Sequence, residues 1–190
     1  SANPKWVAAD LLAQAEHDVV AQAVLATNDE SLAKKVADEI EIQIESLKTK
    51  EIARQSIDKY GRIIITESLE EACELANKKA PEHLELALEA GPVRDKLQEL
   101  VCNYGSLFIG HYAAEVFGDY SAGLNHTLPT AGAAHYTGGL SVRMFLKTVT
   151  TLQVKEGSEG MVKSASAAGL FGDAEGLVAH AKAARIRLEK

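Results

Sequence analysis

The chain has 190 residues, 46% of them hydrophobic, which is enough apolar surface for one ordinary domain with a small appendage. A formal net charge of −7 and a pI near 5.4 argue against a nucleic-acid partner, because phosphate neutralisation needs a basic face. There is no apolar run of about 18 residues and no signal-peptide pattern, so we expect no membrane contact. Only two cysteines occur, neither in a CxxC pair, which favours the cytoplasm and no disulfide.

Helical and strand patterns alternate over residues 6–110. Apolar residues recur every three or four positions from Leu32 to Leu47, and Ser68 with Glu71 forms a capping-box pattern. Three consecutive isoleucines at 63–65 suit a strand covered on both faces. This alternation predicts an α/β fold with an incomplete Rossmann-like, largely parallel sheet flanked by helices. The expected helices cover 6–17, 28–61, 68–80 and 93–100, and the expected strands cover 19–27, 62–66, 84–88 and 106–110.

Periodicity disappears between residues 118 and 139, where glycine, threonine, proline and aromatic residues dominate. A loop of that length inside a compact domain is usually functional. A helix over 140–145, a strand-like segment at 150–154 and two helices over 159–170 and 173–188, joined by Gly172, are expected to follow. We therefore predict an α/β part over 1–148 and a C-terminal helical appendage over 149–190.

Two pairs of polar side chains in the first part are candidates for chemistry. Gln14 and His17 lie three residues apart at the end of a predicted helix, so both could reach one metal ion. Glu82 and His83 follow Pro81 at the entrance to a strand and could supply two bases, one for water and one for a substrate proton. Each pair could equally be an exposed surface feature.

The long loop and the last helix supply further candidates. Asp119, Asn125 and His126 could bring a carboxylate and an imidazole to one site, although an ordinary surface loop has the same composition. Glu175 and His180 are five residues apart and so do not share a helix face. If both act, they contact different parts of one ligand; otherwise they are structural or exposed.

Several long motifs, taken in order, resemble the histidinol dehydrogenase family. They are DLLAQAEHD at 10–18, APEHLEL at 80–86, GSLFIG at 105–110, GDYSAGLNHTLPTAG at 118–132, GLSVRMFLK at 139–147 and the Glu175/His180 pair. Their spacing holds from the first predicted helix to the last, so the resemblance covers nearly the whole chain.

The resemblance implies an activity: NAD-dependent oxidation of L-histidinol to L-histidine through an aldehyde, with two NAD molecules, in histidine biosynthesis. It implies Glu82 and His83 as catalytic bases, with His83 also touching substrate. Zinc would be held by Gln14, His17, Asp119 and His180, which also contact the substrate together with His126 and Glu175. In the family the C-terminal histidine reaches the zinc of the other subunit, which implies a homodimer with exchanged C-terminal helices.

The chain departs from the family in length, because family members are more than twice as long and their N-terminal part binds the nicotinamide cofactor. No GxGxxG fingerprint occurs here. The chain could be a truncated or cleaved form of a normal enzyme, half of a split enzyme whose partner binds NAD, or a zinc-binding assembly module without dehydrogenase activity. A zinc hydrolase in which Glu82 activates water is a further alternative. We expect little or no dehydrogenase activity from the chain alone.

Overall fold

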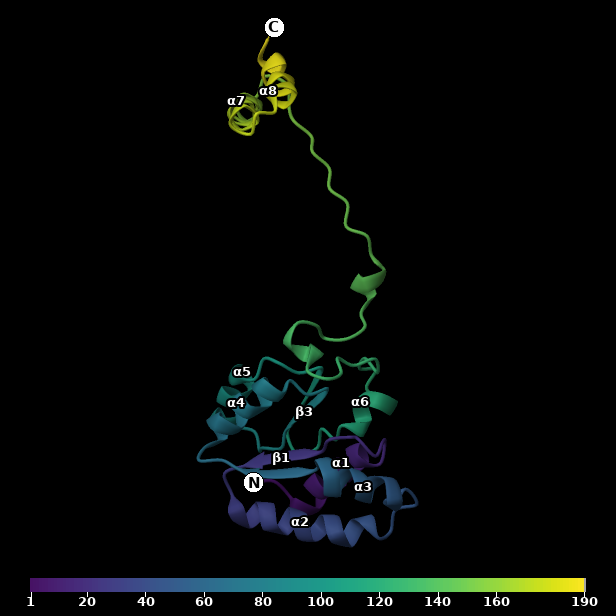
Figure 1. Cartoon of the computed structure of the whole chain (residues 1–190). Helices are drawn as coiled ribbons and strands as arrows, with labels where there is room; N and C mark the ends of the chain where they lie inside the picture. Colours follow the sequence, from purple (N-terminus) through teal and green to yellow (C-terminus); the bar gives the residue numbers. More distant parts are fainter. Residues whose placement is uncertain (190) are drawn as a thin grey trace. The chain divides into compact units, whose positions relative to one another are not determined.

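A computed structural model describes residues 1–189, which divide into two compact units, residues 1–145 and residues 146–189 (Figure 1). The first unit contains α1 (Pro4–Ala15), β1 (Val24–Thr27), α2 (Glu30–Ile44), α3 (Lys50–Tyr60), β2 (Arg62–Ile65), α4 (Leu69–Lys79), β3 (His83–Leu86), α5 (Pro92–Leu100), β4 (Ser106–Ile109) and α6 (Val116–Tyr120). Short 3-10 turns follow at Ala133–His135 and Val142–Phe145. The second unit contains α7 (Glu159–Ala174), α8 (Val178–Arg185) and a 3-10 turn at Ile186–Leu188.

The strands of the first unit pair in parallel, as the alternation of helix and strand predicts. β1 pairs with β2 from Val24 opposite Arg62, and β3 pairs with β4 from His83 opposite Ser106. Within residues 1–189 these pairs form two separate two-stranded sheets. The predicted α/β class with parallel strands flanked by helices is confirmed. No helix in this range combines the length and apolar character needed to cross a bilayer.

Each sheet lies beside its own apolar core. The first core packs α1 against α2 and α3, and the second packs α4 and α5 beside β3 and β4 (Figure 1). The buried residues of the first core are Ala8, Leu12, Ala15, Val36, Ile40, Ile44 and Ala53. Those of the second are Cys73, Leu86, Leu97 and Val101. The site described below is built where α1 approaches β3.

Helix α1 serves two purposes because its two faces differ. Ala8, Leu12 and Ala15 recur at helical spacing and are buried in the first core. Asp10 and Gln14, one turn apart, share the opposite face and contact side chains of β3. The same helix therefore anchors a core and presents polar groups to the site.

The predicted helix over 28–61 is wrong, because two helices, α2 and α3, occupy this range. The chain turns between them, where the Ser46 hydroxyl donates to the carbonyl of Gln43 at 2.8 Å. Leu47 lies in this turn yet packs against the first core, so the apolar spacing continues across the break. The turn therefore cannot be predicted from hydrophobic periodicity alone.

The strands of the first sheet also differ from expectation. β1 begins only at Val24, since Val19 and Val20 are exposed in a turn where the carboxylate of Asp18 accepts the backbone N–H of Val20 at 2.9 Å. β2 is not covered on both faces, because Ile63 and Ile65 are 38% and 49% exposed. An apolar run here marks a strand, but only one of its faces is packed.

Beyond the loop, regular structure is scarcer than predicted. The segment 150–154 forms no strand, and the expected helix over 140–145 is reduced to the 3-10 turn Val142–Phe145. α7 continues through the expected break at Gly172, where an added Cβ would lie 2.7 Å from the backbone nitrogen of Ala181. Gly172 is thus a close-packing position between α7 and α8.

Candidate active site

A glutamine and a histidine from two distant motifs meet at the centre of the site. Gln14 lies in the last turn of α1, and His83 is the first residue of β3. Ala80 ends α4 in the left-handed region (φ 49°), and Pro81 then turns the chain into the strand. Nδ1 of His83 lies 3.0 Å from Oε1 of Gln14. The QAEH and PEHLE motifs are therefore joined by a direct side-chain contact.

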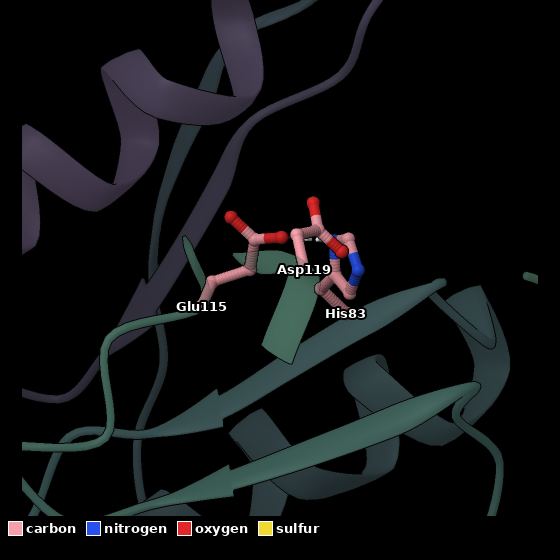
Figure 2. A group of neighbouring side chains, drawn as sticks. All are labelled: His83, Glu115 and Asp119. Atoms are coloured by element: carbon pink, nitrogen blue, oxygen red, sulfur yellow. Dashed lines mark ion pairs between the residues drawn. The ribbon is translucent and has the colours of Figure 1, made fainter. Parts of the chain in front are cut away.

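A buried carboxyl group that was not predicted completes this contact. Glu115 directly precedes α6 and is only 5% exposed. Its Oε2 accepts a hydrogen bond from Nε2 of Gln14 at 2.5 Å. Its Oε1 lies 3.3 Å from Nδ1 of His83 and has no hydrogen-bond partner. Figure 2 shows the side chains of Glu115, His83 and Asp119 pointing toward one another.

The long loop adds a carboxylate and an imidazole. Asp119 lies in the short helix α6, and its Oδ1 is 2.9 Å from Nδ1 of His126. The Asp119 side chain is nearly buried, whereas that of His126 is 72% exposed. Two of the three residues predicted from this loop therefore form one pair, with the carboxylate inward and the imidazole outward.

Burial sets most of the electrostatics. Desolvation, more than any neighbouring charge, lowers the pKa of His83, which favours a neutral imidazole that can accept a proton. Burial first, and then the negative charge of Asp119, raises the pKa of Glu115 to about 7. For Asp119, burial opposes ionisation, but the hydrogen bond and charge of His126 outweigh it and lower the pKa.

A second carboxyl pair joins α1 to β3 beside these residues. Asp10 and Glu85 are hydrogen-bonded to each other, and such a bond requires a proton between the two groups. Burial and the nearby charge of Asp10 raise the pKa of Glu85 to about 8, and burial also raises that of Asp10. Glu85 is therefore the member that holds the shared proton at neutral pH.

The donor atoms of the site suit a metal ion that accepts nitrogen and oxygen ligands. His83, Glu115 and Asp119 each offer one such atom, and these atoms lie within 4.8 Å of one another. The unpartnered Oε1 of Glu115 shows that the cluster has acceptor capacity left over. Imidazole nitrogen with carboxylate or amide oxygen is a donor set compatible with Zn²⁺.

Of the remaining predicted residues, two belong to the first unit and two to the second. His17 is exposed just beyond α1, close enough for its charge to affect His83. Glu82 is half-buried in the turn before β3, and its carbonyl accepts the backbone N–H of Ser106 at 2.8 Å. Glu175 caps the end of α7 and His180 lies in α8; both are exposed and belong to the second unit.

Glycine at position 105 keeps the Glu82 turn close to the loop. A Cβ on Gly105 would lie 2.6 Å from the carbonyl oxygen of Glu82 and 2.7 Å from Cδ of Pro129. No real Cβ is accommodated at such distances without movement of its neighbours. Gly105 therefore allows two of the predicted motifs, PEHLE and NHTLPT, to pack closely against the same backbone position.

Asp10, Glu85 and Glu115 were not predicted, although the first two had a signal in the sequence. Asp10 lies four residues before Gln14 on a helix, and Glu85 lies two residues after His83 on a strand, so each shares a face with a predicted site residue. Glu115 lies four residues before Asp119, between the predicted strand over 106–110 and the predicted loop over 118–139. Extending each candidate along its own periodicity would have found the first two.

Comparisons with known proteins show the family of the chain. The family model described as histidinol dehydrogenase matches residues 1–188. A histidinol dehydrogenase from a Synechococcus species is 46% identical over 187 residues, covering 98% of this chain and 42% of that protein. One from Aquifex aeolicus is 44% identical over 188 residues, again with 98% and 42% covered.

A solved structure has the same fold. The crystal structure of histidinol dehydrogenase from Elizabethkingia anophelis matches with a TM-score of 0.92 and 37% sequence identity, covering 99% of this chain and 42% of that one. The chain thus spans about two fifths of the length of the relatives it matches. By the match of the family model to residues 1–188, this chain belongs to the histidinol dehydrogenase family.

Proposed function

We propose that this chain forms the zinc-binding and base-bearing part of a histidinol dehydrogenase, an enzyme that oxidises L-histidinol to L-histidine through the aldehyde with two NAD molecules. One observation carries the proposal. Gln14, His83 and Asp119 come from three separate family motifs, and they converge on Glu115 within one buried cluster. The nicotinamide cofactor would bind in the part of the family fold that this chain does not span.

Zinc is the metal proposed for the site. Its proposed ligands are Gln14, His17, Asp119 and His180. When bound, the ion would act as a Lewis acid that anchors the imidazole and amino groups of the substrate. Asp119 suits this role because its pKa is lowered, despite the opposing effect of burial, by the hydrogen bond and charge of His126. His126 and Glu175 are proposed as substrate contacts, alongside the ligands themselves.

Two bases divide the proton transfers. His83 is proposed to take the proton of the substrate hydroxyl in the first oxidation, since burial keeps its imidazole neutral. Glu82, next to it at the start of β3, is proposed to activate the water that adds to the aldehyde before the second oxidation. Hydride transfer itself belongs to the nicotinamide cofactor.

The second unit is proposed to serve assembly. We propose a homodimer in which the helices of residues 149–190 are exchanged, so that His180 and Glu175 complete the site of the other subunit. Zinc affinity and dimerisation would then be coupled. The cytoplasm is the proposed location, a compartment that keeps the free thiols of Cys73 and Cys102 reduced.

Calorimetric titration of L-histidinol into the purified chain, with and without zinc, tests the substrate and the metal together. We expect binding only to the zinc-loaded protein, and at least about tenfold weaker binding in Asp119→Asn. Glu74→Gln, an exposed change on α4, is the matched control and should bind as the parent chain does. L-leucinol, which lacks the imidazole, should not bind. The proposal would be contradicted if L-histidinol bound with the same affinity with and without zinc, or if L-leucinol bound as tightly as L-histidinol.

Two further measurements address activity and assembly. NAD-dependent oxidation of histidinol by the chain alone is expected to be absent, and turnover would show that the cofactor site lies within these residues. The chain should also fail to hydrolyse esters when zinc is present, because Glu82 and His83 are proposed to act in the oxidation of histidinol and not in hydrolysis. Native mass measured before and after chelation should fall from dimer to monomer, and an unchanged mass would exclude a shared His180 ligand.

A further inference from the structure

Three side chains form a line of contacts that ends on the proposed base. Glu115 Oε2 is 2.5 Å from Gln14 Nε2, and Gln14 Oε1 is 3.0 Å from His83 Nδ1. Both ends of the line are shielded from water, since Glu115 is 5% exposed and the His83 side chain is 15% exposed, and Gln14 between them is partly buried. Each contact therefore imposes a donor on one side and an acceptor on the other.

The carboxyl group of Glu115 fixes the orientation of the Gln14 amide. If the amide were reversed, its oxygen would face a carboxyl oxygen at 2.5 Å, and two acceptors at that distance repel unless a proton lies between them. With the NH₂ group facing Glu115, the amide oxygen must face His83. Glu115 thus determines which atom of Gln14 the imidazole meets.

Because the amide oxygen of Gln14 accepts hydrogen bonds, the imidazole of His83 must donate an N–H to it. Nδ1 of His83 is the nitrogen that meets Gln14 Oε1, and Glu115 Oε1, also an acceptor, lies 3.3 Å from the same nitrogen. A lone pair on Nδ1 would face two oxygen atoms. Both neighbours therefore favour the hydrogen on Nδ1.

We propose that Glu115 is a positioning residue which, through the amide of Gln14, holds neutral His83 in the Nδ1–H tautomer and so makes Nε2 the proton-accepting nitrogen. Phe108 packs beside His83, with the two ring centroids 5.7 Å apart and the ring planes at 70°. This edge-on contact restricts rotation of the imidazole. That Nε2 serves as a base rests on the function proposed above. The tautomer itself depends only on the contacts described.

Nitrogen-15 NMR of the zinc-free full chain tests the proposal, because the two neutral tautomers give different imidazole shifts and couplings. The spectrum is recorded at about pH 8, above the ordinary pKa of histidine. The His83→Asn spectrum identifies the His83 signals by their loss. We expect Nδ1–H in the parent chain and a shift toward Nε2–H, the form that free histidine prefers, in Glu115→Leu. An Nε2–H signal in the parent chain would overturn the proposal.

Two more variants separate the relay from general effects of charge or folding. Gln14→Leu breaks the middle link and should shift the tautomer in the same direction, which keeps the test open if Glu115→Leu does not fold. Glu74→Gln, an exposed change on α4, removes a charge without touching either link and should leave the tautomer as it is. A tautomer unmoved by Gln14→Leu, or moved equally by Glu74→Gln, would refute the relay. No substrate is used, so a failure of histidinol binding would not affect this result.

Discussion

Replacement of Glu85 by glutamine should remove a pH-dependent weakness of the first unit. Glu85 on β3 is hydrogen-bonded to Asp10 on α1, and its pKa is raised to about 8 by burial and by the charge of Asp10. In the unfolded chain this carboxyl returns to an ordinary pKa near 4.5. Between these two values the folded state binds a proton that the unfolded state has released.

The sign of the effect follows from this difference. Stability falls with pH wherever the folded state binds more protons than the unfolded state, so the free energy of unfolding should fall from about pH 4.5 to about pH 8 and then level off. A shift of about 3.5 units corresponds to at most about 5 kcal/mol at 1.36 kcal/mol per unit. Because Glu85 is only half-buried, we expect roughly half of that.

Glutamine keeps the size of Glu85 and can donate a hydrogen bond to Asp10 at every pH. Glu85→Gln should therefore show a shallower fall of stability with pH than the parent chain, with the raised pKa of Glu115 supplying the slope that remains, and at pH 8 it should exceed the parent chain by about 2 kcal/mol. Glu74→Gln, on the exposed face of α4, is the control and should retain the slope of the parent chain.

Urea unfolding followed by tryptophan fluorescence provides the measurement. Trp6 is the single tryptophan and lies in α1, the helix that carries Asp10, so its signal reports on the first unit. Free energies of unfolding at several pH values between 5 and 9 give the slope for each variant. Equal slopes in the parent chain and Glu85→Gln, or a loss of stability in Glu85→Gln at pH 8, would refute the shared-proton interpretation.

Three other changes have expected outcomes. Gly105→Ala should cost about 2 kcal/mol in urea unfolding, because the new methyl group would lie 2.6 Å from the carbonyl oxygen of Glu82; an unchanged midpoint would contradict that contact. Gly172→Ala should loosen the packing of α7 on α8 and speed proteolysis of residues 146–190, with an equal cleavage rate as the adverse result. His126→Ala removes the hydrogen bond and charge that lower the pKa of Asp119, so as the pH is lowered, zinc binding measured by titration should be lost at a higher pH than in the parent chain.

The sequence predicted the class of fold but not the boundaries set by tertiary packing. Leu47 continues an apolar helical pattern although it lies in a turn, because a turn residue can still reach the core. Val19 and Val20 have strand propensity, yet Asp18 binds the backbone of Val20 and ends the strand pattern before β1. Local propensity was overruled in both places by contacts that depend on residues elsewhere in the chain.

Gln14, His83 and Asp119 come from three separate motifs, and the structure places them together, although their roles stay predictions. Asp10 and Glu85 lie inside the same motifs but were not predicted, because nothing in the sequence pairs the two carboxyl groups. Glu115 stands outside every recognised pattern, and its importance comes from burial between three elements. Burial of a lone glutamate is a tertiary property, which one sequence does not encode in any local spacing.

Because helix α1 belongs to both the first core and the site, the position of Gln14 depends on how the core is packed. Its buried stripe of Ala8, Leu12 and Ala15 is seated in a close-packed interior, while Gln14 on the opposite face meets His83. A substitution such as Leu12→Met would tilt or slide the helix by a fraction of an ångström and move the amide with it. A substitution on the buried face of α1 should thus change the affinity of the site for its ligand, even though every polar residue of the site is unchanged.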